Sequence, residues 1–272
     1  MLDPSVFIGQ YPFRHLPHPD PEVLVKVMAR EGITRAWVGY LPATFHRDPT
    51  PANVELNRLL APFRDVLVPA PAIRPDFPGW DKAVAAAAAE GAEAVRVYPS
   101  HWRLGADDPR LADLMRTCAA HKLAVVVTVR FEDLRQRHPL DTAGDVPGAA
   151  LRAMARAGDG VRLVVCAAGR ELIEEVHWGL TPAEQRRVWW DFSWVWGPPE
   201  DHLAHLFRTI GPSRFVFGSQ WPLRLVQAPK ANLELLPDRR ARPSANTIRC
   251  EPAAAFRAPA GFVCPGGPAR DP

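Results

Sequence analysis

The feature that most constrains the fold is a repeated alternation of short apolar runs and amphipathic segments before residue 237. The apolar runs have the length of buried strands, and the segments between them have the length and periodicity of helices. Strands are predicted at 5–9, 33–40, 65–73, 94–99, 122–130, 161–168, 187–197 and 214–218. Helices are predicted at 21–31, 52–62, 80–91, 108–121, 147–157, 170–177 and 199–210. Eight strands with intervening helices predict an α/β fold, a single-domain TIM-type (β/α)8 barrel, with an open doubly wound sheet as the alternative.

The predicted seventh strand, 187–197, is unusually rich in tryptophan. Strict alternation places Trp190, Trp194 and Trp196 on one apolar face, which we expect to pack beneath the helices. The same run ends at the carboxyl edge of the predicted sheet. Trp194 and Trp196 are therefore also candidates for the mouth of the barrel.

The last predicted strand stops abruptly in the stretch 214–222, which reads RFVFGSQWP. Gly218 lets the backbone turn, and Pro222 prevents further sheet pairing. Ser219 and Gln220 then follow the strand at its carboxyl end, where parallel α/β folds bind ligands. We expect both residues to lie in a pocket, although an ordinary strand-to-loop turn would explain the same pattern.

Composition and charge exclude several functional classes. The net charge of +3 lies entirely in residues 237–272, so the predicted barrel is neutral and lacks a nucleic-acid-binding surface. The longest apolar runs are strand-sized, and the start of the chain has no signal-peptide pattern, so we expect no membrane span. The four cysteines lie far apart, without metal-binding spacing, which is typical of reduced thiols in a cytoplasmic protein.

Residues 237–272 differ from the rest of the chain. This segment contains seven prolines and six arginines and lacks helical periodicity, so we expect a disordered or irregular tail after a barrel domain of residues 1–236. A reading-frame shift near Pro237 would explain the loss of a closing helix. An apolar groove left there would favour self-association, so a homo-oligomer is an open prediction.

Several segments together resemble the amidohydrolase-related (amidohydrolase 2) barrel family, which includes aminocarboxymuconate-semialdehyde decarboxylases and pyrone-dicarboxylate lactonases. The resemblance covers about residues 1–225 and includes LDPSVFIG, GITRAWV, LVPAPAIRPDFPGWDKAV and VRLVVCAAG. Its most specific parts are the fourth strand with its DDPRL helix and the closing FGS-x-x-P pattern. The resemblance implies a (β/α)8 barrel with hydrolase-type chemistry at the strand ends.

The chain departs from that family at each metal-ligand position. Ser5 and Phe7 stand where the family's first-strand His-x-His pair would stand, and Gln220 replaces the closing Asp. The fifth strand ends in Thr128, Val129 and Arg130, and the sixth in Cys166, Ala167 and Ala168, where histidine ligands would be expected. A neutral amide accepts no proton from water and is a poor ligand for a catalytic divalent ion. The sequence therefore predicts no cofactor and no metal site of the family's type.

Polar side chains at the predicted strand ends supply the candidate site. His46, His138 and Gln220 are the candidate catalytic residues, because loop histidines titrate near neutral pH. The candidate substrate-binding residues are Gln10, Tyr11, Arg14, Arg74, Arg96, Tyr98, His101, Arg130, Glu132 and Trp221. Converging arginines suit a small anionic ligand, because a guanidinium binds carboxylate in a bidentate fork.

Structural roles explain some of these residues equally well. Arg130 and Glu132 could form an ion pair at the barrel mouth, and His46 and His138 could simply be solvated. His202 and His205 share a helix face and are expected on the surface. Cys166 is expected to be a small buried residue rather than a nucleophile.

Two functions follow. The first is a metal-free hydrolase of a small carboxylate-bearing lactone or ester, in which His46 or His138 activates water. The second is an inactive barrel that binds a small anion or a protein partner. A titratable base close to a pocket water near Gln220 would distinguish them, and two histidines that point away from the pocket would remove the predicted bases.

Overall fold

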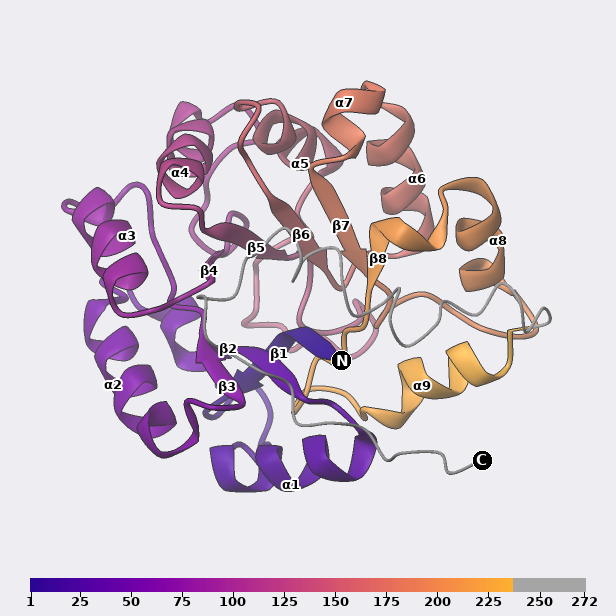
Figure 1. The fold of residues 1–272 in the computed structure, drawn as a ribbon, viewed down its shortest axis with the longest axis horizontal. Helices are drawn as coiled ribbons and strands as arrows, with labels where there is room; N and C mark the ends of the chain where they lie inside the picture. Colours follow the sequence, from indigo (N-terminus) through magenta and orange to yellow (C-terminus); the bar gives the residue numbers. More distant parts are fainter. Residues whose placement is uncertain (237–272) are drawn as a thin grey trace, which may run out of the picture.

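The computed structural model describes residues 1–236, so the predicted tail and the proposed frame shift lie outside the described residues. Residues 1–236 form eight strands with helices around them (Figure 1). The strands are β1 Leu2–Ile8, β2 Arg35–Tyr40, β3 Leu67–Pro69, β4 Ala94–Val97, β5 Ala124–Thr128, β6 Leu163–Cys166, β7 Val188–Asp191 and β8 Phe215–Val216. The helices are α1 Pro21–Glu31, α2 Thr50–Leu60, α3 Trp80–Ala89, α4 Pro109–Ala120, α5 Gly148–Ala155, α6 Arg170–Trp178, α7 Pro182–Gln185, α8 His202–Thr209 and α9 Gln227–Glu234. Short 3-10 turns cover Leu41–Phe45, Ala61–Phe63 and Pro212–Arg214.

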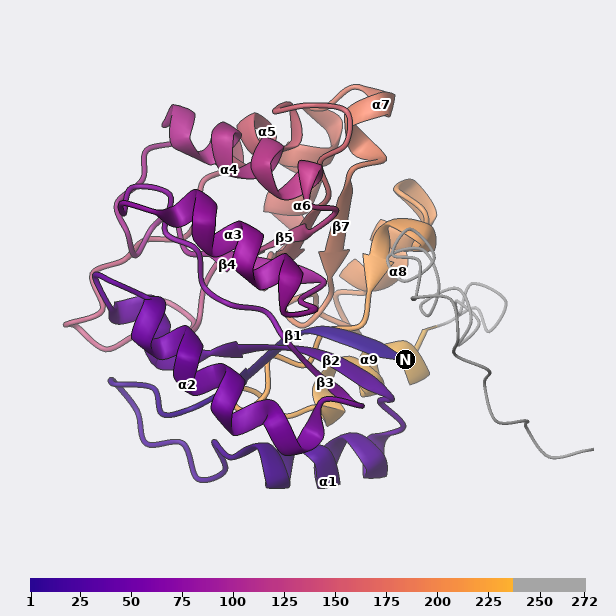
Figure 2. The same cartoon turned by 60° about the vertical axis from the view of Figure 1, so that its left-hand side comes forward.

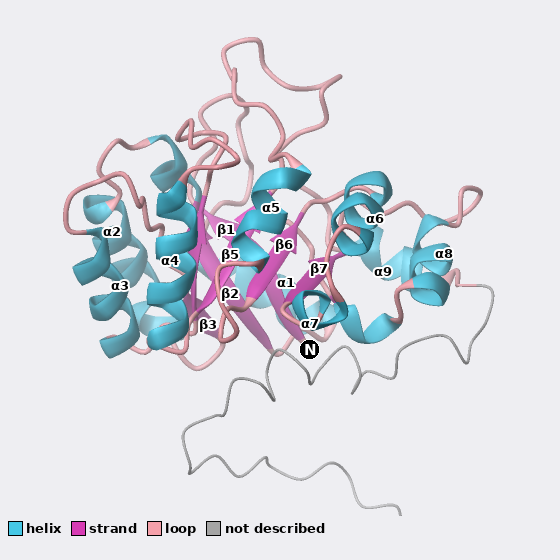
Figure 3. Cartoon of the chain, turned by 90° about the horizontal axis from the view of Figure 1, so that it is seen from above, coloured by secondary structure: helices cyan, strands magenta, loops and turns pink. Residues whose placement is uncertain are grey.

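The strands are parallel and form two hydrogen-bonded groups, β1-β2-β3 and β4 to β8 in sequence order. Backbone bonds close both gaps. A parallel bridge joins Ala72 to Arg96, and the Phe7 amide donates to the Trp221 carbonyl at 2.8 Å. Figures 2 and 3 show the helices outside the strands. The predicted barrel is confirmed, and the open sheet is excluded by these two closures.

Local signals explain several helix boundaries. Pro21 occupies the first turn of α1, and Gly32 ends the helix in the left-handed conformation, at φ 71°. Asp108 caps α4 by accepting a bond from the Arg110 amide. The predicted apolar face of α4 is buried against the barrel. Lys230 of α9 contacts Glu31 at 2.7 Å, which fixes α9 beside α1 (Figure 1).

The inside of the barrel holds charged side chains among small ones. Arg96 is fully buried and donates to the backbone carbonyls of Pro4, Val6 and Trp37. Gly39 makes this possible, since a Cβ there would lie 2.6 Å from the Arg96 Cδ atom. The interior is therefore polar around Arg96, although inward-facing side chains such as Val126 and Val164 also form an apolar cluster inside the barrel.

The seventh strand differs most from its prediction. β7 ends at Asp191, and the following residues leave the sheet in a turn. Trp194 and Trp196 consequently do not pack beneath the helices, which corrects the predicted face. Within residues 1–236, no helix is long and apolar enough to cross a membrane.

Candidate functional site

A pocket of about 520 Å³ opens at the carboxyl ends of the strands. Its walls come from the loops that follow β1, β5, β7 and β8. This is the end of a (β/α)8 barrel where active sites are built. The lining residues are Arg14, Phe131, Glu132, Asp133, Arg135, Gln136, Trp194, Trp196, Leu223 and Arg224. We call this space the mouth pocket.

One wall of the mouth pocket combines indole rings with guanidinium groups. The Arg224 guanidinium carbon lies 4.4 Å from the Trp194 ring centre and 5.9 Å from that of Trp196. Arg130 approaches the Trp194 ring at 5.4 Å. Burial lowers the pKa of Arg224, but a guanidinium remains cationic at neutral pH. Among the described residues, the Arg224 side chain has no ion pair and no hydrogen bond, so its donors remain available.

The acids of the mouth pocket are paired with other arginines. Arg14 Nε contacts Glu132 Oε1 at 2.7 Å, and Arg14 also donates to the Leu223 carbonyl. Asp133 accepts from Arg135 at 2.9 Å, a hydrogen bond that lowers the pKa of Asp133 to about 2. Neither acid forms an ion pair with Arg224, and Asp133 and Asp191 act on it only through longer-range electrostatics. Arg224 therefore remains available to pair with an anion.

Gln220 lies fully buried behind the tryptophan wall. Its side-chain oxygen accepts from Trp194 Nε1, and its Nε2 donates to the Arg130 carbonyl at 2.8 Å. Its backbone amide donates to Ser5 Oγ at 2.9 Å. The adjacent Ser219 amide bonds to the buried Asp3 carboxylate. Gln220 therefore connects the loop after β8 to β1 and to the loops after β5 and β7. Both polar atoms of its side chain are hydrogen-bonded to the protein.

A buried polar cluster connects the long loop after β5 to the loops after β1 and β4. The Tyr11 hydroxyl donates to Asp141 Oδ2 at 2.8 Å, and His101 Nε2 lies 3.5 Å from Asp141 Oδ1. Burial lowers the pKa of His101 to about 4, so the ring is neutral at physiological pH. Phe131 packs against His101 and separates it from the pocket space. We call Tyr11, His101 and Asp141 the loop latch.

Two further buried carboxylates lie deeper in the barrel. Asp3 accepts from the backbone and hydroxyl of Ser5. Asp191 accepts from the Ala167 amide at 2.9 Å and from Ser193. Burial raises the pKa of Asp3, and it raises that of Asp191 to about 6.

The structure brings only some predicted residues to the mouth pocket. Arg14 and Glu132 line it, whereas Arg130 and Gln220 hold its wall from behind. Arg130 pairs with Asp145 at 2.7 Å, so the predicted Arg130–Glu132 pair is not formed. His46 and His138 are exposed and do not line the pocket; His138 stacks on Phe13. The structure therefore places neither candidate histidine base beside Gln220.

The other predicted residues lie away from the pocket space. Tyr11 and His101 belong to the loop latch, and Arg74 pairs with Asp76 at 2.8 Å. Arg96 is inside the barrel rather than at its mouth, which corrects its predicted position. The remaining three, which also do not line the pocket, are Gln10, Tyr98 and Trp221.

The structure agrees with the structural roles predicted for two histidines of α8 and for Cys166. His202 and His205 are both partly exposed on α8, and His205 Nε2 lies 2.7 Å from Glu174 Oε1. Cys166 is fully buried, and burial raises the pKa of its thiol well above the ordinary value. A thiol in that state is a weak nucleophile at neutral pH.

Sequence reasoning missed Arg224, Asp141 and Asp191. Arg224 follows Gly218 within a few residues, so its position just after the last strand is the signal in the sequence that points to it. Nothing in the local sequence indicates a role for Asp141, because its partners Tyr11 and His101 lie far from it along the chain.

In this chain, the residues that stand at the metal-ligand positions of the amidohydrolase-related family do not form a set of metal ligands. Across residues 1–236, no three His, Cys, Asp or Glu side chains gather as ligands for a metal ion. Gln220 is committed to Trp194 and Arg130, and Asp3 and Asp191 are surrounded by protein hydrogen-bond donors. These residues do not fit a mononuclear metal site of the family's type.

No family model and no curated protein matches the sequence. Solved structures do match in fold. A dihydroxybenzoic acid decarboxylase from Polaromonas, with bound manganese and the inhibitor 2-nitroresorcinol, has a TM-score of 0.66 at 12% identity and covers 94% of this chain and 97% of its own. Metarhizium anisopliae IDCase in apo form gives 0.64 at 16% identity, over 92% of this chain and 83% of its own.

A third match is a probable 2-pyrone-4,6-dicarboxylic acid hydrolase from Acinetobacter baumannii with citric acid bound. It has a TM-score of 0.60 and 12% identity, over 89% of this chain and 94% of its own. The chain thus shares the (β/α)8 barrel fold of amidohydrolase-2-type hydrolases and decarboxylases. The resemblance seen in the sequence is confirmed at the level of the fold.

Proposed function

We propose that this barrel binds a small, planar, carboxylate-bearing molecule in the mouth pocket. The observation that carries the proposal is Arg224, a half-buried guanidinium that lies against two indole rings and forms no ion pair within residues 1–236. A carboxylate satisfies the unused donors of such a guanidinium in a bidentate geometry. A flat ligand body can lie against Trp196, which remains 46% exposed.

The bound molecules named in the structural matches support this chemistry. One match is a complex with citric acid, and another is a 2,6-dihydroxybenzoate decarboxylase complexed with 2,6-dihydroxybenzoate. Both molecules carry carboxylates and have a size that a pocket of about 520 Å³ accepts.

Calorimetric titration tests the proposal with benzoate and with benzamide, its neutral counterpart of the same shape. We expect benzoate to bind and benzamide to bind at least about tenfold more weakly, because only the anion pairs with Arg224. Arg224→Gln should abolish the difference, whereas Arg208→Gln on the exposed face of α8 should leave it unchanged. Equal affinity for the two molecules would refute the proposal.

A second candidate function is hydrolysis of a lactone or ester, and the position of Glu132 favours it. Its carboxylate is buried, lines the mouth pocket and is oriented by Arg14. In this mechanism Glu132 accepts a proton from water as the water oxygen attacks the substrate carbonyl carbon. The single bond between the acyl carbon and the alkoxy oxygen then breaks, and Glu132 returns its proton to the leaving alkoxy oxygen, which gives the alcohol and the acid. Arg224 holds the substrate carboxylate in place throughout.

Assays with a carboxylated aryl lactone would test this function. Glu132→Gln keeps the side-chain volume but removes the base, so we expect hydrolysis to fall by at least about 100-fold while benzoate affinity changes little. His46→Gln and His138→Gln should retain activity, since both rings lie outside the pocket. Full activity in Glu132→Gln would exclude this mechanism.

A further inference from the structure

Gln220 occupies the position where the resembling family carries its closing aspartate, but the structure gives it different partners. We propose that Gln220 is a positioning residue that fixes the Trp194 ring and, through that ring, the Arg224 guanidinium. This inference rests on the proposed carboxylate-binding function. It assigns Gln220 a role in binding in place of the predicted catalytic role.

The side-chain amide of Gln220 connects two loops by hydrogen bonds. Its amide oxygen accepts from Trp194, in the loop after β7, and its amide nitrogen donates to the Arg130 carbonyl after β5. Glutamine is the residue of this length that offers an acceptor and a donor on one planar group. Aspartate or glutamate would supply the acceptor only, so the pair of contacts specifies an amide.

The backbone of Gln220 supports the same conclusion. Its φ is 56°, in the left-handed region that residues other than glycine rarely adopt. Such a conformation persists only where surrounding contacts hold it. Here the Ser5 hydroxyl accepts from the Gln220 amide at 2.9 Å, and the side chain is held at both ends. The residue is thus built into a single orientation.

Trp194 transmits that orientation to the ligand-binding cation. The ring is 6% exposed, and the Arg224 guanidinium lies against it at 4.4 Å. Because the indole N–H is held by Gln220, the ring cannot turn without breaking a buried hydrogen bond. Arg224, a residue of the pocket wall, therefore lies against a ring whose orientation is already fixed before any ligand arrives. Such preorganisation raises affinity by reducing the ordering that binding requires.

A double-mutant cycle on benzoate affinity tests the inference. The variants are Gln220→Met, which keeps the length but loses both hydrogen bonds, Arg224→Lys, which keeps the charge but loses the fork, and their combination. We expect Gln220→Met to weaken benzoate binding about tenfold, because the Trp194 ring loses its fixed orientation and Arg224 must then be ordered by the ligand. In the Arg224→Lys background the same change should have less than about a twofold effect, because the oriented fork is already gone.

Matched variants separate positioning from general damage. Gln227→Met, at an exposed position on α9, should leave benzoate affinity unchanged. Trp194→Phe keeps an aromatic ring for Arg224 and loses the indole N–H that donates to Gln220. It should weaken binding less than Gln220→Met, and it provides the cycle if the methionine variant does not fold.

The outcomes distinguish this inference from the proposed function. Strictly additive effects of the Gln220 and Arg224 changes would overturn the positioning role while leaving carboxylate binding intact. Wild-type protein that does not bind benzoate would overturn both. Non-additive effects of the Gln220 and Arg224 changes on benzoate affinity, with unchanged affinity in Gln227→Met, would support the positioning role of Gln220.

Discussion

Gly218 lies directly against the buried carboxylate of Asp191. A Cβ atom built on Gly218 would lie 2.6 Å from both Cβ and Cγ of Asp191, closer than real contacts allow. Asp191 cannot move away easily, because it is fully buried and holds the Ala167 amide and the Ser193 hydroxyl. The glycine that ends the last strand therefore makes room for a buried acid as well as turning the chain.

Gly218→Ala should destabilise the protein by about 1–3 kcal/mol, the usual cost of overpacking a filled interior. Chemical denaturation measures the change in the free energy of unfolding. Gly144→Ala is the control, since its added methyl group meets no atom within 4 Å. Equal stabilities for wild type and Gly218→Ala would show that Asp191 has room to move.

The pKa of Asp191 should make stability depend on pH. It rises on folding from 3.8 to about 6, so the folded state binds more protons than the unfolded state between these values. The contribution of Asp191 to stability therefore falls as pH rises from about 4 to about 6, by roughly 3 kcal/mol in total. Relative to wild type, Asp191→Asn should become more stable across this interval. Parallel pH profiles of the unfolding free energy for the two proteins would contradict this.

His101 should contribute with the opposite sign. Its pKa falls on folding from 6.5 to about 4, so the unfolded state binds the extra proton between those values. The stability due to a neutral His101 is present above about pH 6.5 and is lost as pH falls toward 4. His101→Phe, which fits among Phe45 and Phe131, should therefore gain stability relative to wild type as pH is lowered. A difference that stays constant with pH would show that His101 is not buried in neutral form.

The loop latch should control opening of the loop after β5. Tyr11→Phe removes the hydroxyl that donates to Asp141, at a cost of about 1–3 kcal/mol for an acceptor left without its partner. Limited trypsin digestion followed by mass spectrometry should show faster cleavage after Arg135 and Arg137. Tyr40→Phe serves as control, because its ring lies outside the latch. Unchanged cleavage rates would mean that Asp141 does not fasten the loop.

The barrel was predictable from the sequence because its strands and helices carry clear apolar periodicity. The Leu111 face of α4 and the glycine end of α1 follow from spacing and backbone preference alone. The seventh strand was overextended, because alternation continues through Trp196 although the chain leaves the sheet after Asp191. Alternation does not show where hydrogen bonding between strands stops.

The pocket was less predictable, because its contacts join distant parts of the chain. Arg130 has Glu132 two residues away, but it pairs with Asp145, and Glu132 pairs with Arg14. Gln220 was predicted to lie in the pocket from its position after the last strand, but it is fully buried and does not line the pocket. Its partners Trp194 and Arg130 could not be deduced from spacing, since only the folded barrel brings three strand ends together.

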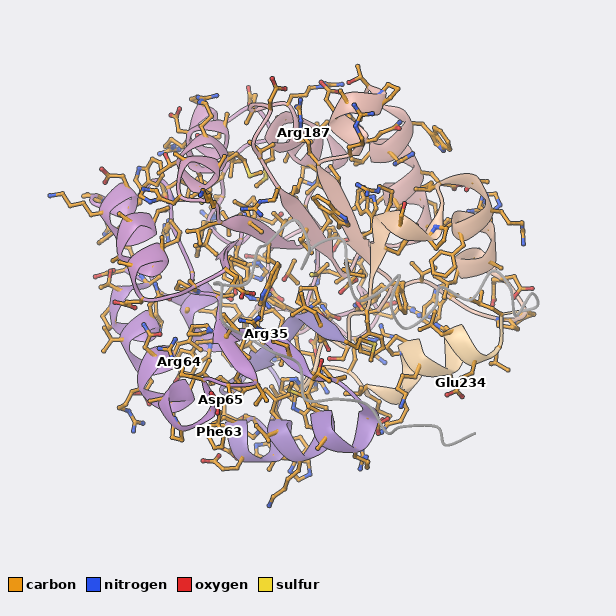
Figure 4. The ribbon with its side chains drawn as sticks, in the orientation of Figure 1. Arg35, Phe63, Arg64, Asp65, Arg187 and Glu234 are labelled. Carbon is orange, nitrogen blue, oxygen red and sulfur yellow. The ribbon has the colours of Figure 1, made fainter. Side chains whose placement is uncertain are left out.

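The most direct test of carboxylate binding in the mouth pocket is a crystal structure of the protein soaked with benzoate. We predict a carboxylate within hydrogen-bonding distance of the Arg224 guanidinium and a ring against Trp196. A second arginine-rich pocket, lined by Arg162, Arg186 and Arg187 among other residues, lies at the opposite ends of the strands and offers an internal comparison. Arg187 is labelled in Figure 4. Benzoate bound there, with the mouth pocket unoccupied at saturating concentration, would contradict the central claim.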